Sequence, residues 1–222
     1  MVGDFASGTA VYVMMDAIRR AQGEALEALG FGPRECPSRS LVSGRRWRLR
    51  DYGKSGGAPS LVIVAAPIKR PYIWDLAPEV SAVRYCLAQG FRVFLVEWIP
   101  PSMSDRGGGL KAYADDGIGE AVRIVSTETG GAKPFLIGHS LGGTLAAVHA
   151  AMHPHRLAGL VLLGTPLCFA PGSSRFRDAL VSMAGPLAWN ADPVQGSLVS
   201  QLSALASPGT FVRSRIEDAA CG

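Results

Sequence analysis

The chain has 222 residues, of which 48% are hydrophobic and 18% are charged, and its formal net charge is +4. This length suits one domain or one and a half, and the apolar fraction is large enough to build a buried core. The small positive charge does not indicate a nucleic-acid partner, and the composition excludes collagen-like, low-complexity and disordered classes.

Cysteine spacing and hydropathy indicate the cellular compartment of the protein. The four cysteines, Cys36, Cys86, Cys168 and Cys221, lie far apart and show no zinc-ligand spacing, so we expect separate reduced thiols, no metal and no cofactor. Residues 1–8 lack the pattern of a signal peptide. The longest uncharged apolar stretch, residues 157–167, is too short for a transmembrane segment. These features predict a cytoplasmic protein.

The N-terminal region carries a helical pattern. Apolar residues recur at helical spacing over residues 8–29, and Gly30 is a natural C-terminal cap. Such an amphipathic helix could lie on a membrane surface, but packing of the apolar stripe on its own domain is the commoner use, and we expect it here. Residues 32–39 read as a connector.

From residue 46 onward, short apolar runs predict strands. In Arg46–Arg50, Trp47 and Leu49 alternate with three arginines, which predicts a strand whose arginine face is solvated rather than a phosphate grip. After a turn at residues 53–59, the runs become continuously apolar, as expected for parallel strands covered on both faces. The predicted strands are 61–66, 91–96, 134–137 and 160–163, and the predicted helices are 78–89, 110–128 and 141–152.

Four apolar strands that alternate with three helices indicate an α/β fold, a mostly parallel sheet with helices on both faces. Beyond Pro171 only short helical segments are expected, at residues 175–183 and 198–206. We divide the chain into an N-terminal helix and connector (1–40), a core (41–170) and the start of a lid or cap (171–222).

A Gly-x-Ser-x-Gly motif lies between strand 134–137 and the helix that follows it. This strand–turn–helix context predicts the nucleophile elbow of the α/β-hydrolase fold, with Ser140 as the catalytic nucleophile in a strained conformation. Gly138 and Gly142 flank the serine because a Cβ at either place would clash. The alternatives are an ordinary Gly-rich turn and a phosphate-binding loop, but the chain lacks the Gly-rich phosphate-loop patterns.

Two backbone N–H groups are candidates for an oxyanion hole. The N–H of Leu141 belongs to a helix N-terminus, where free N–H groups and the helix dipole favour negative charge. The second donor is expected in the loop Ala66–Lys69, after strand 61–66. Pro67 has no N–H, so Ile68 is the candidate.

A family resemblance runs through roughly residues 60–170. The chain resembles polyhydroxyalkanoate synthases in Leu61–Leu76, Val83–Gly90, Phe91–Trp98, Gly138–Thr144 and Thr165–Phe169, in the same order. The most distinctive part is Pro71–Leu76, and the resemblance implies an oxyanion-hole role for Ile68.

The resemblance also marks a departure at the nucleophile. The resemblance implies a cysteine at the position where this chain has Ser140. Thiolates suit chain transfer between thioesters, whereas water commonly resolves a serine ester. The serine therefore favours an esterase, thioesterase or depolymerase, and acyl transfer to an alcohol stays open.

The general base that Ser140 requires is not evident in the sequence. The acid and the histidine follow the serine in α/β-hydrolases, but no histidine lies beyond residue 155. His139 adjoins Ser140 and points elsewhere. His149 lies nine residues along the helix, about 13 Å away. His153 and His155 lie farther along.

Downstream acids do not fill the gap. None of them follows a predicted strand, and Cys168, expected as a packed thiol, stands where the resemblance implies an aspartate. These acids are Asp178, Asp192, Glu217 and Asp218. We therefore expect the 222 residues to be an inactive fragment that stops within the lid.

These observations predict a serine hydrolase acting on acyl esters, thioesters or polyesters through a Ser140 acyl-enzyme. The alternatives are a synthase-like acyltransferase and a non-catalytic relative that binds a partner or a granule surface. The expected partner is the acyl substrate, small or polymeric, with no nucleic acid, and a homodimer is left open.

Overall fold

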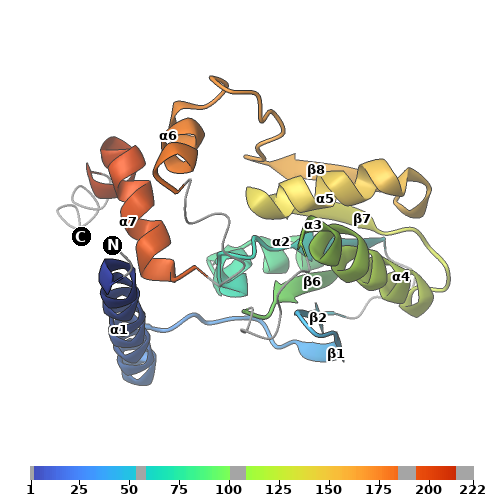
Figure 1. Cartoon of the computed structure of the whole chain (residues 1–222). Helices are drawn as coiled ribbons and strands as arrows, with labels where there is room; N and C mark the ends of the chain where they lie inside the picture. The colour runs from blue at the N-terminus through green and yellow to red at the C-terminus, as the bar shows by residue number, and fades with distance from the viewer. Residues whose placement is uncertain (1–2, 54–58, 101–108, 185–193, 214–222) are drawn as a thin grey trace. The chain divides into compact units, whose positions relative to one another are not determined.

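The computed structural model describes residues 3–53, 59–100, 109–184 and 194–213 (Figure 1). Residues 33–167 form one compact unit, and residues 1–32 group with residues 168–222 in a second. Each unit has its own helices, and the Gly-x-Ser-x-Gly motif lies in the first.

A six-stranded sheet forms the centre of the unit 33–167, in the order β1-β2-β6-β3-β7-β8. The pairs β3–β6, β3–β7 and β7–β8 are parallel, whereas β1–β2 and β2–β6 are antiparallel. The strands are β1 (Arg39–Ser43), β2 (Trp47–Asp51), β3 (Ser60–Val64), β6 (Arg92–Trp98), β7 (Phe135–His139) and β8 (Gly159–Leu163), and β4 (Asp75–Ala77) pairs separately with β5 (Val80–Ser81).

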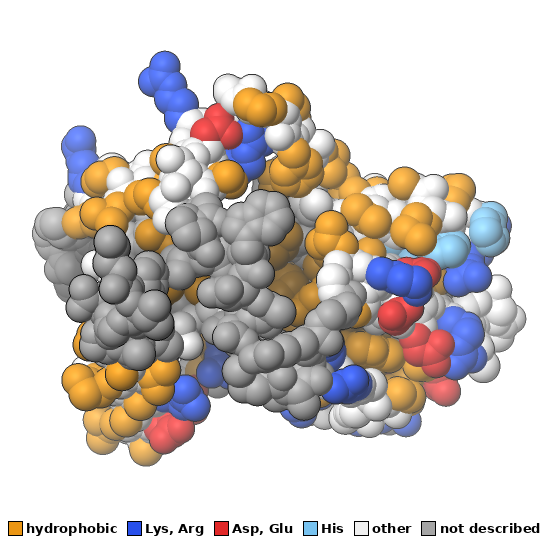
Figure 2. Space-filling model, in the orientation of Figure 1, with side chains coloured by type: hydrophobic (Ala, Val, Ile, Leu, Met, Phe, Trp, Pro, Cys, Tyr) orange, Lys and Arg blue, Asp and Glu red, His pale blue; other side chains and the backbone are white. Residues whose placement is uncertain are grey.

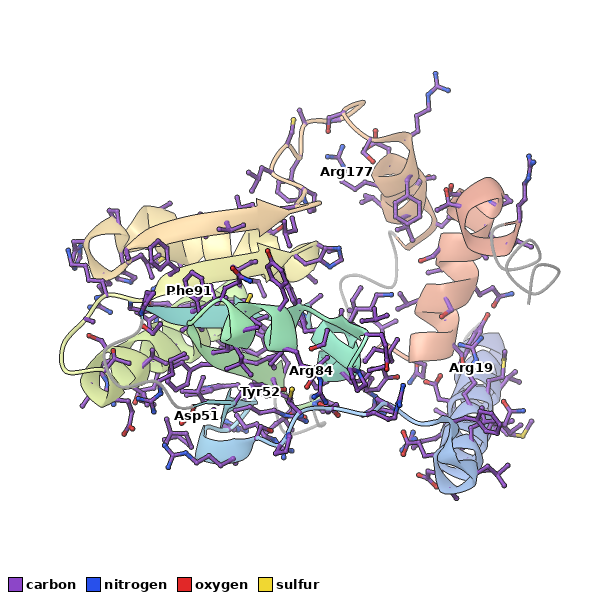
Figure 3. The ribbon with its side chains drawn as sticks, turned by 180° about the vertical axis from the view of Figure 1, so that it is seen from behind. Arg19, Asp51, Tyr52, Arg84, Phe91 and Arg177 are labelled. Carbon is purple, nitrogen blue, oxygen red and sulfur yellow. The ribbon has the colours of Figure 1, made fainter. Side chains whose placement is uncertain are left out.

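Helices cover both faces of this sheet, which confirms the predicted fold class. The helices α4 and α5 lie in front of the strands in Figure 1, and α2 lies in front of them in Figure 3, which views the molecule from behind. The helical elements are α2 (Ala82–Ala88), α3 (Gly109–Lys111), α4 (Ile118–Glu128), α5 (Leu141–Met152), the 3-10 turns η2 (Pro71–Trp74) and η5 (Pro154–Arg156), and the π-helix η4 (Ala112–Gly117).

The order of the strands creates a switch point at the carboxyl edge of the sheet. From β3 the chain moves to β6 on one side and then returns to β7 on the other side of β3. Loops that leave the carboxyl ends of β3 and β7 therefore diverge, and such crevices are where open parallel sheets bind ligands. The elbow follows β7, and the predicted oxyanion loop follows β3.

Two of the predicted helices differ from the structure. The helix predicted at 78–89 begins only at Ala82, because Asp75–Ser81 forms the β4–β5 ladder and the Ser81 hydroxyl caps the helix by accepting from the Arg84 N–H at 2.9 Å. The helix predicted at 110–128 is interrupted by η4.

The first strand of the sheet was not predicted. Residues Arg39–Ser43 form the antiparallel edge strand β1, in place of the end of the connector. Its residues are mostly polar and exposed, so they lack the apolar alternation that reveals a half-buried strand. The turn predicted at 53–59 falls mainly on residues 54–58, outside the described residues.

The arginine face of β2 is paired rather than simply solvated. Arg50 donates to Glu97 on the neighbouring strand at 2.6 Å and to Glu35 at 2.7 Å, and Arg48 lies 3.4 Å from the same Glu97 carboxylate. Cross-strand carboxylates therefore neutralise much of this face, which leaves no evident phosphate grip on β2.

The second unit consists of helices. They are α1 (Gly3–Leu26), the π-helix η1 (Glu27–Phe31), α6 (Arg175–Ala184), α7 (Gly196–Ala206) and the π-helix η6 (Gly209–Arg213). Asp16 of α1 accepts hydrogen bonds from the N–H groups of Gly196 and Ser197, at 3.0 and 2.8 Å, and thereby caps the N-terminus of α7. Gly30 has φ 86 and interrupts η1 from within, and the residue that caps this element is Gly32 rather than the predicted Gly30.

The apolar stripe of α1 does not pack as expected. Val11, Met14 and Ile18 are 53%, 60% and 48% exposed, whereas the polar side chains Tyr12 and Asp16 face α7. Figure 2 shows hydrophobic side chains gathered on the surface of this helix. Polar contacts, not the apolar stripe, join α1 to its neighbour.

Candidate active site

Ser140 stands at the junction of β7 and α5. Its backbone has φ 53 and ψ −130, and among the described residues no other non-glycine has a positive φ. The Ser140 N–H donates to Leu163 O of β8 at 3.0 Å, and its carbonyl accepts from the Thr144 N–H at 3.1 Å. The strand ladder and the helix thus meet at this one residue, which is held in a conformation that L-residues rarely adopt.

Glycines make this turn possible. A Cβ on Gly138 would lie 2.5 Å from the Gly143 Cα, and a Cβ on Gly142 would lie 2.8 Å from Ala65 O and closer still to Val64 O. Both contacts involve backbone atoms, which cannot rotate away. The first turn of α5 is therefore seated directly on the carboxyl end of β3.

The loop after β8 completes the support of the elbow. A Cβ on Gly143 would overlap the Thr165 side chain, and the Thr144 hydroxyl donates to Pro166 O at 2.9 Å. The start of α5 is held between β3 and this loop. The part played by Thr165 has no local sequence signal, since the contact joins residues 22 positions apart.

The two candidate oxyanion donors lie on neighbouring segments of the same sheet edge. Leu141 is the first residue of α5, so its N–H is one of those that no helical carbonyl accepts. Ala66–Lys69 forms a turn closed by a hydrogen bond from the Lys69 N–H to Ala66 O at 2.9 Å. Ile68 stands at the third position of this turn, where the turn hydrogen bond leaves the N–H free.

His139 packs against an aromatic side chain of η2 and makes no hydrogen bond with the Ser140 hydroxyl in the part of the chain that the structure describes. Its ring packs edge-on against the ring of Trp74, with centroids 6.4 Å apart. Within the described residues the Ser140 hydroxyl has no hydrogen-bond partner. His139 therefore does not serve as the base in this arrangement.

The other three histidines gather at the far end of α5. His149 is fully buried, its Nδ1 lies 2.9 Å from Ala114 O, and burial lowers the pKa of the imidazole although the Ala114 carbonyl opposes this. His153 Nε2 lies 2.9 Å from Asp115 Oδ1, and the ring of His155 lies beside that of His153. These side chains support η4 and do not reach Ser140.

Of the downstream acids, Asp178 has a local structural role. Asp178 accepts from the Gly172 N–H at 2.7 Å, and its hydrogen bond with Arg177 lowers the pKa of its carboxyl. Cys168 is exposed, which corrects the expectation of a packed thiol. Asp192, Glu217 and Asp218 lie outside the described residues.

Among the described residues, no group of three or more histidine, cysteine, aspartate or glutamate side chains is arranged to hold a metal ion. No helix in the described ranges combines the length and the apolar character needed to cross a membrane.

Comparison with known proteins extends this picture. The chain is 38% identical over 109 residues to the poly(3-hydroxyalkanoate) polymerase subunit PhaC of Haloferax mediterranei, covering 49% of this chain and 22% of that protein. It is 31% identical over 138 residues to the corresponding subunit of Allochromatium vinosum, covering 60% and 39%. The chain thus spans well under half the length of these relatives.

Solved structures give weaker similarities. Epoxide hydrolase A from Mycobacterium thermoresistibile has a TM-score of 0.44 and 19% identity, covering 67% of this chain and 45% of that chain. The thioesterase domain from the curacin biosynthetic pathway has a TM-score of 0.43 and 18% identity, covering 69% and 53%.

The family model described as alpha/beta hydrolase fold matches residues 74–205, more than half of the chain. This range contains β6, β7, the elbow, α5 and β8. The match agrees with the mostly parallel sheet and with the strand–elbow–helix geometry at Ser140. The chain therefore belongs to the α/β-hydrolase fold family.

Proposed function

We propose that Ser140 is the nucleophile of a serine hydrolase acting on acyl esters, thioesters or polyesters. The observation that carries this proposal is the positive φ of Ser140. The serine is flanked by Gly138 and Gly142, where nearby backbone atoms leave no room for a larger residue. Such strain costs roughly 1–3 kcal/mol and persists only where the surrounding structure imposes it, which is typical of functional positions.

The proposed reaction proceeds through an acyl-enzyme. The Ser140 oxygen attacks the acyl carbonyl and forms a C–O bond while a base takes the hydroxyl proton, and the carbonyl oxygen becomes an oxyanion. The N–H groups of Leu141 and Ile68 are proposed to donate to it. The bond to the leaving alcohol or thiol then breaks, the leaving group takes a proton, and water resolves the serine ester.

The base for this reaction is not one of the four histidines, since His139 packs on Trp74 and the other three lie at the far end of α5. We therefore expect the 222 residues alone to show no measurable ester turnover. The proton acceptor must be supplied by a group outside the described residues.

A second candidate is acyl transfer to an alcohol, and the curated relatives favour it. They are named poly(3-hydroxyalkanoate) polymerases and are 31–38% identical to the matched region. Transfer would share the Ser140 acyl-enzyme and would differ only in the acceptor, a hydroxyl group of a growing chain instead of water.

The test uses protein expressed from the complete reading frame. A fluorophosphonate probe is expected to label Ser140, and Ser140→Ala is expected to abolish labelling. The matched control is Ser126→Ala, because Ser126 lies on α4 away from the elbow, and this variant should label normally. Incubation with a p-nitrophenyl ester and with a 3-hydroxyacyl thioester then separates hydrolysis from chain growth by the products formed.

The proposal fails if intact folded protein is not labelled and releases neither free acid nor polymer from these substrates. That result would favour the non-catalytic alternative, a relative that binds a partner or a granule surface.

A further inference from the structure

The indole of Trp98 joins the end of β6 to the end of β3. Its Nε1–H donates to Ala65 O at 2.6 Å, and both residues are buried. The β3–β6 ladder ends at the pair Val64–Val96, whereas β6 continues beside β2 as far as Trp98. A side-chain donor therefore takes over where the backbone ladder stops.

The carbonyl that Trp98 holds lies immediately before the turn that bears Ile68. The turn begins at Ala66, whose carbonyl accepts from the Lys69 N–H at 2.9 Å. The orientation of the Ala65–Ala66 peptide plane sets the direction in which the turn leaves the sheet, since the peptide is planar and only its flanking dihedrals rotate. A rotation at this peptide would redirect the Ile68 N–H.

The same carbonyl is confined from its other side. A Cβ on Gly142 would lie 2.8 Å from Ala65 O, so the first turn of α5 rests against this carbonyl. The Ala65 carbonyl thus lies between the Trp98 indole and the helix that begins directly after Ser140. Both oxyanion candidates, Leu141 and Ile68, are positioned by segments that meet at this atom.

The indole itself has little freedom to move. Its ring packs edge-on against Tyr113 of η4, with centroids 5.0 Å apart, and a Cβ on Gly117 would lie 2.9 Å from the ring. The π-helix η4 therefore restricts the Trp98 ring by packing against it, and the ring in turn donates a hydrogen bond to the end of β3. The packing and the hydrogen bond can be separated by experiment, because an aromatic ring without the N–H would preserve most of the packing.

We propose that Trp98 is a positioning residue of the Ser140 site, whose indole N–H orients the Ala65 peptide so that the Ile68 N–H faces the oxyanion. This inference rests on the proposed function, because it assigns Trp98 to the oxyanion site of that reaction. The oxyanion forms in the tetrahedral stages of acylation and deacylation and is absent from the bound substrate, so a misdirected donor lowers kcat and leaves KM nearly unchanged.

The experiment replaces the indole N–H in protein expressed from the complete reading frame. Trp98→Phe is compared with Trp47→Phe, a buried tryptophan directly across the β2–β6 pair. Trp98→Phe is expected to lower the fluorophosphonate labelling rate of Ser140 and the kcat for a p-nitrophenyl ester about tenfold, less than the 100-fold or greater loss that follows deletion of a whole donor. KM should stay within about twofold, and Trp47→Phe should leave kcat unchanged.

A spectroscopic readout separates positioning from general stability. The Ile68 amide resonance in a 1H–15N correlation spectrum should shift in Trp98→Phe and stay in place in Trp47→Phe. If Trp98→Phe does not fold, 3-benzothienylalanine at position 98 provides the isosteric ring without an N–H, and the same fall in kcat is expected.

Two outcomes are distinguishable. Absence of Ser140 labelling in the unmodified protein overturns the proposed function together with this role of Trp98. Labelling of the unmodified protein, with Trp98→Phe or the benzothienyl protein as fast as Trp47→Phe, overturns the positioning role alone.

Discussion

At the scale of single residues, the elbow depends on glycines, because a Cβ atom at these positions would clash with neighbouring atoms. The positions of Gly138 and Gly142 are crowded by backbone, whereas that of Gly143 is crowded by the Thr165 side chain. Backbone crowding cannot be relieved by a second substitution, but side-chain crowding can. The three glycines therefore have different predicted responses to a methyl group.

We expect Gly143→Ala to lower the free energy of unfolding by about 2 kcal/mol, because overpacking forces shifts in a close-packed region. Adding Thr165→Ala should recover part of that loss, since it removes the hydroxyl and methyl groups that the new Cβ would meet. Urea unfolding followed by circular dichroism measures both effects.

The control lies on α1, where a Cβ on Gly23 would meet nothing within 4 Å. Gly23→Ala should be neutral or stabilise by up to about 1 kcal/mol, because alanine is the better helix former. Equal losses in Gly143→Ala with and without Thr165→Ala would contradict the predicted clash.

At the scale of elements, a buried carboxylate at the start of β4 joins β5 and α2 to the chain before β1. Asp75 has no exposed surface and accepts from the Ser81 hydroxyl at 2.6 Å and from the Cys36 N–H. Arg84 of α2 lies 3.6 Å away (Figure 3). One carboxylate thus contacts three segments that are not adjacent in the sequence.

Asp75→Ala is expected to cost about 3 kcal/mol of stability, because it leaves a buried hydroxyl and a backbone N–H without their acceptor and removes the carboxylate that faces the Arg84 guanidinium. The matched control is Glu79→Ala, which removes an exposed ion pair with Arg34 and should change stability by less than about 0.5 kcal/mol. Thermal unfolding of the two variants decides the point, and similar melting temperatures would count against the structural role of Asp75.

The junction of η4 and α5 gives the fold a predictable response to acid. Burial lowers the pKa of His149 below its ordinary 6.5, although the Ala114 carbonyl and Asp115 oppose the shift and His153 and Arg156 add to it. Below about pH 6.5 His149 is protonated in the unfolded chain but stays neutral in the folded chain. The free energy of unfolding therefore falls as the pH drops from there toward the folded pKa.

His149→Gln should therefore flatten the loss of stability below about pH 6.5, since the variant has no imidazole at position 149 to protonate. His155→Gln, at an exposed position, should retain the slope of the unmodified protein. Urea midpoints at several pH values provide the measurement, and parallel pH profiles for all three proteins would refute the assignment.

At the scale of the whole molecule, the last strand of the sheet has the composition of an interior strand. In β8, Leu160, Val161 and Leu163 are 37%, 43% and 42% exposed, and the strand contains no charged residue. Edge strands usually carry charges or prolines that prevent pairing with other chains. We therefore expect this edge of the sheet to favour self-association.

We expect the 222-residue chain to associate as its concentration rises, and Val161→Lys to reduce the association, because a charge on an edge strand opposes pairing. Met152→Lys places the same charge on an exposed apolar position of α5 and should have a smaller effect. Sedimentation velocity over a concentration series distinguishes them, and a chain that stays monomeric throughout would contradict this prediction.

Local sequence patterns were enough to predict the alternation of strands and helices, the mostly parallel sheet and the position of the elbow at Ser140. These follow from patterns within a few residues, such as the apolar run Leu61–Ala66 or the glycines around Ser140, whose preferences act locally. The elements that were misjudged lack such patterns. The strand β1 is polar, and the start of α2 is decided by the cap at Ser81.

The strand order, the packing of α5 on β3 and the contacts that surround the elbow could be read only from the three-dimensional structure. Trp98 meets Ala65 across 33 positions, and Thr165 meets Gly143 across 22. Such contacts depend on how distant segments pack in three dimensions, and neither partner carries a local signal of the other. The elbow at Ser140 could be predicted from the residues next to it in sequence. The groups that position it could be identified only from the residues next to it in the structure.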